Sequence, residues 1–394
     1  MRLIFWLTAL VGTQALAQKF EFAKLASTPY SAETGFGLES RPGETPIYFS
    51  VRVPAEGNYK VTVKFGDKDR DSVTTVKAEL RRLMLERVRT KAGKYETRTF
   101  IVNVRRPGIP GGGQVRLKDR EKTSEAWAWD DKLTLEFTDA QPAVRSVEVE
   151  KVDRLPTLYI AGDSTSTDQP LEPFNSWGQM ITRFFKPEIA VANHGESGES
   201  LKGFLSEGRL DKVMSLIQPG DYLFIQMGHN DQKEKGEGVG AMTTYKADLK
   251  HFIAVTREHG ATPVVITPVN RMSFESGTGK IVSSLGDYPE AVRQTTQEEN
   301  VALIDLNAMS KPFYDALGPE QAHVAFAGND NTHHSNYGSY ELAKCVVEGI
   351  KAARLPLVKY LVDMPKFDPA NPDPFERFDI PAEPAGPAIK PYGN

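Results

Sequence analysis

The pattern of apolar residues changes near residue 155, and this change constrains the fold more than any other feature of the chain. Before it, residues 47–53, 59–65, 133–137 and 147–149 alternate apolar with polar side chains, a pattern typical of strands with one buried and one solvated face. After it, short apolar runs alternate with amphipathic helical stretches. We therefore predict an antiparallel β-sandwich domain followed by an α/β domain, whose parallel sheet is covered by helices on both faces.

The predicted β-sandwich spans residues 19–153 and the predicted α/β domain spans residues 154–357. Within the second domain the candidate strands are residues 157–161, 189–193, 222–227, 262–267 and 301–305, and the candidate helices are residues 177–185, 210–217, 245–259 and 290–299. Residues 358–394 are rich in proline and have little periodicity, which predicts an irregular tail along the surface. A chain of 394 residues with 40% hydrophobic content is long enough to bury a core in each domain.

The amino-terminal residues predict export. Met1-Arg2 is followed by an apolar stretch at residues 3–11 and by Ala15-Leu16-Ala17, the order of a cleavable signal peptide at residues 1–17. A membrane anchor is the alternative, but the apolar run is shorter than the ~20 residues that span a bilayer. We therefore expect a secreted or periplasmic protein without stable membrane association.

The net charge argues against a nucleic-acid partner, and the cysteine content excludes intramolecular disulfides. Lys and Arg total 48 against 52 Asp and Glu, a net charge of -4, which leaves no basic excess for a phosphate backbone and argues against nucleic acid. Cys345 is the single cysteine, so no intramolecular disulfide can form. It lies in a helical pattern at residues 340–350, where we expect a small buried hydrophobic side chain. The sequence makes no prediction of oligomeric state.

Four short motifs follow one another in the α/β region. Gly162-Asp163-Ser164 comes directly after the apolar run at residues 155–161, so Ser164 is predicted on a tight turn at the end of a buried strand. Gly198 and Asn230 follow the second and third candidate strands, and Asp330 and His333 lie near the end of the domain. Because open α/β sheets bind ligands beyond the carboxyl ends of their strands, we expect Ser164, Gly198 and Asn230 to converge.

These residue types predict acyl-transfer chemistry. A serine needs a base to become a nucleophile, and we expect His333 to be that base, with Asp330 accepting the other imidazole N–H. A negatively charged tetrahedral intermediate needs preorganised donors. The backbone N–H of Ser164, expected at a helix start, the N–H of Gly198 and the amide of Asn230 can provide them. As alternatives, Gly198 is a turn glycine and Asn230 a loop cap.

The order and spacing of these motifs over residues 155–355 resemble the SGNH (GDSL-like) hydrolases. Asp330-x-x-His333, the Asn-x-x-x-x-Gly-x-Ser stretch ending at Ser200, and Thr267-Pro268-Val269-Asn270-Arg271 are most similar to the rhamnogalacturonan acetylesterase branch. The resemblance implies a three-layer, flavodoxin-like parallel-sheet domain. Glu199 stands where that branch often has an arginine, so this position is expected to affect sugar specificity and leave the chemistry unchanged.

Other residues near the motifs are weaker candidates. We predict substrate contacts from five of them, namely Asp163, Thr165, Trp177, Glu199 and Arg271. If residues 126–130 form a strand, Trp127 and Trp129 lie on one side of it, and they either stack on sugar rings or, more commonly for such a pair, belong to the sandwich core. The remaining histidines of the motifs, His194, His229 and His334, are expected to have structural roles. No histidine or cysteine spacing suits a zinc site, so we predict no metal and no cofactor.

The resemblance, with which the export signal and the additional β-domain agree, implies a carbohydrate O-acetylesterase that acts on plant cell-wall polysaccharide, with rhamnogalacturonan or pectin first and acetylated xylan second. The β-sandwich is expected to shape or extend the glycan site without contributing chemistry. A lipid or acyl-thioester hydrolase would use the same catalytic groups, and a non-catalytic glycan-binding protein is the alternative outside enzymes.

Overall fold

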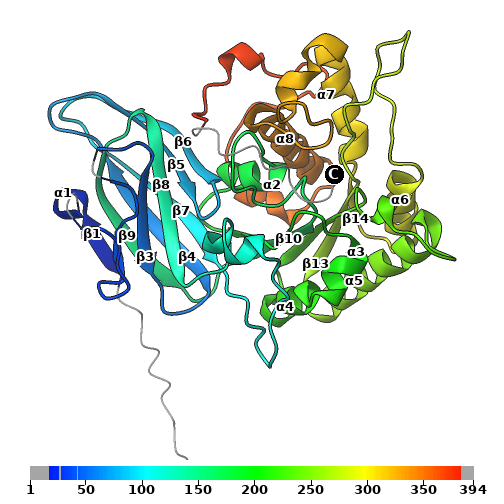
Figure 1. The fold of residues 1–394 in the computed structure, drawn as a ribbon, viewed down its shortest axis with the longest axis horizontal. Helices are drawn as coiled ribbons and strands as arrows, with labels where there is room; N and C mark the ends of the chain where they lie inside the picture. Colours follow the sequence, from blue (N-terminus) through cyan, green and yellow to red (C-terminus); the bar gives the residue numbers. More distant parts are fainter. Residues whose placement is uncertain (1–16, 26–27, 42, 383–394) are drawn as a thin grey trace, which may run out of the picture.

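The computed structural model describes residues 17–25, 28–41 and 43–382 of the chain. Residues 1–16, which form nearly all of the predicted signal peptide, and residues 383–394 of the predicted tail lie outside the described residues. Figure 1 shows a domain of two β-sheets on one side and an α/β domain on the other.

The amino-terminal domain is the predicted antiparallel β-sandwich. One sheet has the order β1 (Gln18–Glu21), β9 (Val144–Val152), β4 (Gly57–Phe65) and β7 (Glu96–Val104). The other has the order β2 (Phe36–Leu38), β3 (Ile47–Arg52), β8 (Lys132–Gln141), β5 (Ser72–Ala78) and β6 (Arg82–Thr90). A four-residue helix, α1 (Phe22–Leu25), follows β1.

Alternation along the strands explains the sandwich. In β4, Val61 and Val63 are buried, whereas the lysine and threonine between neighbouring apolar positions point outward. The valines of β4 belong to the same apolar cluster as Phe49 of β3 and Leu135 of β8. The two sheets therefore pack face to face around one core.

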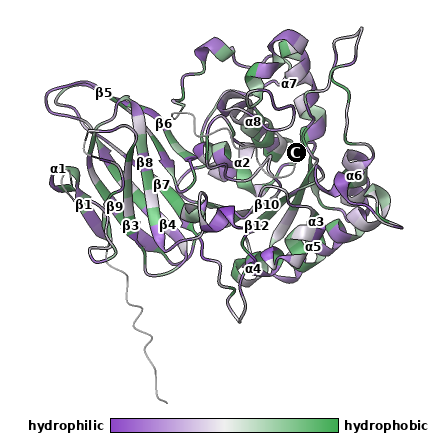
Figure 2. Cartoon of the chain, in the orientation of Figure 1, coloured by the Kyte–Doolittle hydropathy of each residue, from purple (hydrophilic) through white to green (hydrophobic). Residues whose placement is uncertain are grey.

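The second domain contains a parallel sheet of five strands. Its order is β11 (Ala190–Asn193), β10 (Thr157–Gly162), β12 (Tyr222–Gln226), β13 (Thr262–Ile266) and β14 (Ala302–Ile304). Along β10, Leu158 and Ile160 belong to one apolar cluster, and Tyr159 and Ala161 belong to another. Both faces of the sheet are therefore buried, which is the reason that its strands are continuously apolar. Figure 2 shows this concentration of apolar residues on the central strands.

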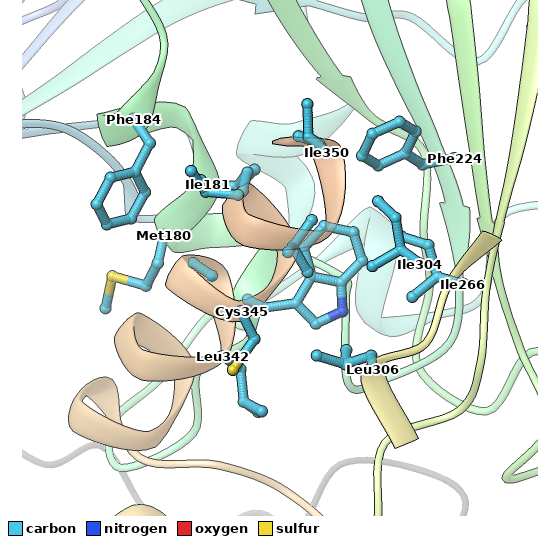
Figure 3. Packing of buried hydrophobic residues seen from close by; sticks show 14 of the residues in the cluster. Met180, Ile181, Phe184, Phe224, Ile266, Ile304, Leu306, Leu342, Cys345 and Ile350 are labelled. Atoms are coloured by element: carbon cyan, nitrogen blue, oxygen red, sulfur yellow. The ribbon is translucent and has the colours of Figure 1, made fainter. Parts of the chain in front are cut away.

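Helices cover the two faces in separate layers. The layer that shares its core with Leu158 contains α2 (Trp177–Met180), α7 (Leu306–Gln321) and α8 (Asn336–Ala352). The opposite layer contains α3 (Leu201–Ser206), α4 (Arg209–Leu216), α5 (Lys246–Glu258) and α6 (Tyr288–Glu298). Cys345 of α8 is fully buried among Ile181, Leu342 and Ile350, as predicted (Figure 3). The domain is thus the expected three-layer α/β fold.

Short 3-10 turns and one π-helix complete the described secondary structure. They are η1 (Arg120–Lys122), η2 (Ala126–Ala128), η3 (Ile181–Phe184), η4 (Asp231–Lys233), the π-helix η5 (Ala241–Tyr245), η6 (Ala322–Ala325), η7 (Pro356–Tyr360) and η8 (Phe375–Arg377). The predicted helix at residues 177–185 is therefore only one turn of α-helix followed by η3. The described part of the predicted tail contains only η8 and most of η7 as regular structure, and it is more than a surface segment, because Phe367 and Ile380 join the apolar core.

Residues 126–130 do not form a strand. Residues 126–128 form η2, and Trp129 is 5% exposed. Its indole N–H donates to Glu121 at 2.8 Å, and the guanidinium of Arg105 lies 4.3 Å from its ring centroid. Trp127 is partly buried against Tyr48, with ring centroids 5.3 Å apart. Trp129 is therefore a core residue and is not available to stack on a sugar.

Several segments of the sandwich contact the α/β domain, among them the turn that leads into β6 and the segment between β7 and β8. The turn between β5 and β6 brings Arg82 to Asp168, with Nε 2.8 Å from Oδ2, and both side chains are almost fully buried. The segment between β7 and β8, cyan in Figure 1, lies between the sandwich and the α/β domain.

Candidate active site

Ser164 lies on a tight turn directly after β10, as the sequence predicts. A Cβ on Gly162 would lie 1.9 Å from Ser166 Oγ, so the close approach of the turn to the strand requires glycine. The Asp163 carbonyl accepts from the N–H groups of Ser166 and Thr167, each at 3.0 Å. No α-helix begins here, since the first helix after β10 is α2, so the predicted support of Ser164 by a helix start is wrong.

Ser164, His333 and Asp330 form one continuous hydrogen-bonded chain. Ser164 Oγ lies 2.7 Å from His333 Nε2, and His333 Nδ1 lies 3.0 Å from Asp330 Oδ2. The backbone N–H groups of Thr332 and His333 donate to Asp330 Oδ1 at 2.7 and 2.9 Å. Burial raises the pKa of Asp330, but the hydrogen bond and charge of His333 outweigh it, and the pKa is well below its ordinary value. The carboxylate is therefore ionised and fixes the Nδ1–H tautomer of the imidazole.

The predicted oxyanion donors lie on loops that are tied to the Ser164 turn. Gly198 has φ +81°, a left-handed conformation that favours glycine. Gln169 Nε2 donates to the Ser164 carbonyl at 2.8 Å and lies 3.3 Å from Ser197 Oγ. Asn230 Nδ2 donates one hydrogen to the Glu199 carbonyl at 2.9 Å, which leaves its second hydrogen available. In the described part of the chain, the N–H groups of Ser164 and Gly198 have no acceptor.

Three of the five predicted substrate contacts are internal. Asp163 is fully buried and accepts from the N–H and hydroxyl of Thr165, at 2.9 and 2.8 Å. Thr165 is also fully buried, and Trp177 belongs to the apolar core and donates through Nε1 to Gln226 at 2.8 Å. The structure therefore gives these residues a role in holding the nucleophile turn and no surface for a sugar.

Glu199 is also placed away from solvent. It is 1% exposed, and its carboxylate forms an ion pair with Lys118 from the sandwich. Burial raises the pKa of Glu199 to about 7, although the charge of Lys118 acts to lower it.

Arg271 is different, because it is partly exposed and donates to Gln232 Oε1 at 2.9 Å and to the His229 carbonyl at 3.5 Å. Arg271 is thus the one of the five that remains accessible beside the Asn230 loop.

The other three histidines of the motifs, His194, His229 and His334, are buried. His229 Nδ1 lies 3.0 Å from Asp163 Oδ2, and its Nε2 lies 3.0 Å from the Val269 carbonyl. His334 Nε2 lies 2.7 Å from Tyr314 Oη, and burial lowers the pKa of His334 to about 3. His194 packs edge-on against Trp129, and burial lowers its pKa well below the ordinary value. These contacts agree with structural roles.

Sequence reasoning missed three residues beside the site. Gln169 bridges the Ser164 turn to the Gly198 loop, and Phe174 packs edge-on against the His333 ring with centroids 5.9 Å apart. Lys233 is exposed, and its Nζ lies 3.4 Å from Asn230 Oδ1. Gln169 and Phe174 lie in a stretch without periodicity, so the only available signal was their position shortly after Ser164.

A cavity of about 520 Å³ lies elsewhere, between the two domains at the amino ends of β10 and β12. Asn58, Thr157 and Tyr222 are among its lining residues, and the predicted site residues are absent from its lining. Because the triad lies at the carboxyl ends of the same strands, this cavity is at the opposite edge of the sheet.

Within residues 17–25, 28–41 and 43–382, no group of three or more His, Cys, Asp or Glu side chains could hold a metal ion, and no helix is long and apolar enough to cross a membrane.

The site contains a serine, a histidine and an aspartate that are linked by hydrogen bonds, and the backbone N–H groups of Ser164 and Gly198 are without acceptors in the described part of the chain. It lies at the carboxyl edge of the parallel sheet in a three-layer α/β domain. This arrangement is that of an ester hydrolase. Comparison with known proteins agrees with this class. The family model of the GDSL-like Lipase/Acylhydrolase family matches residues 160–373. The chain belongs to this family, and the protein is an esterase.

Two proteins of Bacillus subtilis (strain 168) are similar to this domain. The chain is 40% identical to rhamnogalacturonan acetylesterase RhgT over 220 residues, which cover 52% of this chain and 94% of that protein. It is 42% identical over 217 residues to the probable rhamnogalacturonan acetylesterase YesY, covering 52% and 97%. A crystal structure of protein YxiM from Bacillus subtilis covers 84% of this chain and 94% of its own, with a TM-score of 0.49 and 23% identity.

Proposed function

We propose that the protein is a serine-dependent carbohydrate O-acetylesterase that removes acetyl groups from rhamnogalacturonan, with acetylated xylan as a second substrate. The observation that carries this proposal is the hydrogen-bonded chain Ser164–His333–Asp330. The names of the relatives at 40% and 42% identity support the substrate class.

The proposed mechanism assigns a step to each group. Ser164 Oγ attacks the acetyl carbon while His333 Nε2 takes the hydroxyl proton, and the N–H groups of Ser164 and Gly198 and the amide of Asn230 stabilise the oxyanion. His333 then protonates the leaving sugar oxygen, which leaves an acetyl-serine. A water molecule, deprotonated by His333, attacks that ester and releases acetate, and the proton returns to Ser164.

Two cations support an acidic polysaccharide as the first substrate. Neither Lys233 nor Arg271 forms an ion pair with a carboxylate among the residues that the structure describes. Arg271 donates at 2.9 Å to Gln232, the residue before Lys233, so the two cations lie near each other. The pKa of Lys233 is lowered by burial and then by the charge of Arg271. Galacturonate carries a carboxylate, whereas the xylan backbone is neutral. The unpaired cations therefore favour rhamnogalacturonan.

The test compares p-nitrophenyl esters of increasing chain length with acetylated polysaccharides. We expect the highest rate on the acetate, and loss of that activity in Ser164→Ala. A maximum at octanoate or longer would support a lipid or acyl-thioester hydrolase instead. Persistent activity of Ser164→Ala at the wild-type level would refute the serine mechanism.

The choice of polymer has its own test. Lys233→Gln should lower acetate release from acetylated rhamnogalacturonan more than it lowers the rate on p-nitrophenyl acetate, because remote contacts act only on a long substrate. Equal effects on rhamnogalacturonan and neutral acetylated xylan would contradict recognition of the carboxylate.

We also propose that the protein is secreted or periplasmic, which cell fractionation of the full-length protein can test.

A further inference from the structure

Two cations of the β-sandwich contact the loop that holds Gly198. Lys118 Nζ donates to the Ser197 carbonyl at 2.7 Å, and a guanidinium N–H of Arg120 donates to the same oxygen. Both side chains are about one-fifth exposed. They come from the segment between β7 and β8, so a different domain holds the peptide between Ser197 and Gly198.

The Ser197 carbonyl and the Gly198 N–H belong to one peptide unit. In a planar trans peptide the C=O and N–H bonds point in opposite directions. Holding the carbonyl on the sandwich side therefore directs the N–H away from the sandwich. Glycine at 198 makes this restraint necessary, because its backbone adopts positive and negative φ with similar ease and a peptide flip would be cheap. Two cationic donors on the carbonyl also polarise the N–H and make it a stronger donor.

The same side chains are anchored on both sides of Gly198. Arg120 Nε donates to Glu196 Oε1 at 2.8 Å, and Lys118 forms an ion pair with Glu199. The Glu199 carbonyl in turn accepts from Asn230 Nδ2 at 2.9 Å. The cluster Lys118, Arg120, Glu196 and Glu199 is thus connected to both proposed oxyanion donors that lie outside the nucleophile turn.

A buried ion pair holds the sandwich segment in place behind this cluster. Arg209 at the start of α4 donates to both carboxylate oxygens of Glu121, at 3.0 and 2.6 Å, and both side chains are 1% exposed. Trp129 adds a hydrogen bond to Glu121. The segment that carries Lys118 and Arg120 is therefore fixed to the α/β domain by contacts that are separate from the Ser197 carbonyl.

We propose that Lys118 and Arg120 are positioning residues that orient the Ser197–Gly198 peptide, so that the β-sandwich completes the oxyanion hole of the neighbouring domain. This inference rests on the oxyanion role of Gly198 in the proposed function. It replaces the expectation that the sandwich contributes nothing to the chemistry.

The experiment measures kcat and KM of Lys118→Met, Arg120→Met and the double variant in the full chain. The substrate is the p-nitrophenyl ester that the wild type hydrolyses fastest. We expect kcat of the double variant to fall ~10-fold or more with KM changed less than about twofold, because the Gly198 N–H acts on the transition state. Lys118→Arg keeps a cationic donor and should restore most of kcat. Reaction of Ser164 with diethyl p-nitrophenyl phosphate should slow in parallel.

A matched control separates positioning from loss of stability. Arg183 of η3 forms an ion pair with Glu86 of β6 across the same domain interface, with Nε 3.2 Å from Oε2. Arg183→Met should lower the melting temperature as the test variants do and leave kcat unchanged. Unchanged kcat in folded Lys118→Met and Arg120→Met, or an equal loss in Arg183→Met, would overturn the inference. If Ser164→Ala stays active, the proposed function fails. The ratio of kcat in Lys118→Met to kcat in the wild type then still shows whether Lys118 affects the rate of the reaction.

Discussion

At the scale of single residues, Asp330 determines what His333 can do. Its Oδ2 accepts from Nδ1, so Nε2 faces Ser164 without a proton and can receive one. The two backbone amides on Oδ1 hold the carboxylate in this orientation. The lowered pKa of Asp330 means that this arrangement persists throughout the neutral range.

Asp330→Asn should therefore lower kcat on p-nitrophenyl acetate by roughly three to four orders of magnitude, because an amide favours the wrong imidazole tautomer. Circular dichroism of the variant checks that the fold is kept. An unchanged rate would mean that another acid orients His333.

Asn230 is the second residue with a testable role, as the proposed side-chain donor to the oxyanion. Asn230→Ala should lower kcat by ~10²-fold or more, the size of effect found when one oxyanion donor is removed. Steady-state kinetics on the same ester test this, and a change confined to KM would contradict the role, because a donor to the oxyanion acts on the transition state.

At the scale of elements, the predicted nucleophile and oxyanion donors lie just after the carboxyl ends of three neighbouring strands, β11, β10 and β12. The turn after β12 is fixed to the start of α3 by one carboxylate, since Asp231 Oδ1 accepts from the Leu201 N–H at 2.9 Å. Asp231 Oδ2 is buried and has no hydrogen-bond partner in the described structure. Burial accordingly raises the pKa of Asp231 to about 8.

This raised pKa has a consequence for stability. Between the unfolded pKa of about 3.9 and the folded value of about 8, the folded state binds more protons, so its stability decreases as pH rises. Asp231→Asn keeps an acceptor for Leu201 and removes the titration. Urea unfolding at several pH values should show a flatter decline for the variant from about pH 4 to about pH 8. Parallel curves would show that Asp231 does not titrate there.

At the scale of the whole molecule, the two domains form one unit around the site. Arg82 of β6 pairs with Asp168, which also accepts from Asn193 Nδ2 at 2.8 Å at the end of β11. Thr182 Oγ1 donates to the Leu83 carbonyl at 2.6 Å, and Leu83 itself belongs to the apolar core of the α/β domain. Removing the sandwich would expose this core and leave buried charges unpaired.

Arg82→Met should consequently lower the free energy of unfolding by ~3–5 kcal/mol, because Asp168 would remain buried without its partner. The control is Asp379→Asn, which removes a more exposed ion pair to Arg87, with Asp379 55% exposed, and should cost about 1 kcal/mol or less. Chemical denaturation compares them, and similar small losses would mean that the interface tolerates an unpaired Asp168.

The sequence by itself determined the elements whose signals are local. Alternation in β4 and continuous apolar runs such as β10 identify strands, because one face or both faces of a strand must leave water. The motifs with Ser164 and Asn230 were readable because short turns after strands hold them, and the motif with His333 was readable because it lies on the loop before α8. The helix α7 was missed, since Pro312, Gly318 and Pro319 interrupt its pattern.

Only the tertiary structure decided which domain orients the proposed oxyanion donors. Lys118 and the Ser197 carbonyl are 79 residues apart, and a single cation on a loop has no periodicity that indicates its partner. Glu199 and the two tryptophans at 127 and 129 show the same limit, because burial depends on what packs against a side chain from another part of the chain. Local patterns follow from the geometry of helices and strands, whereas contacts between loops depend on how whole layers come together.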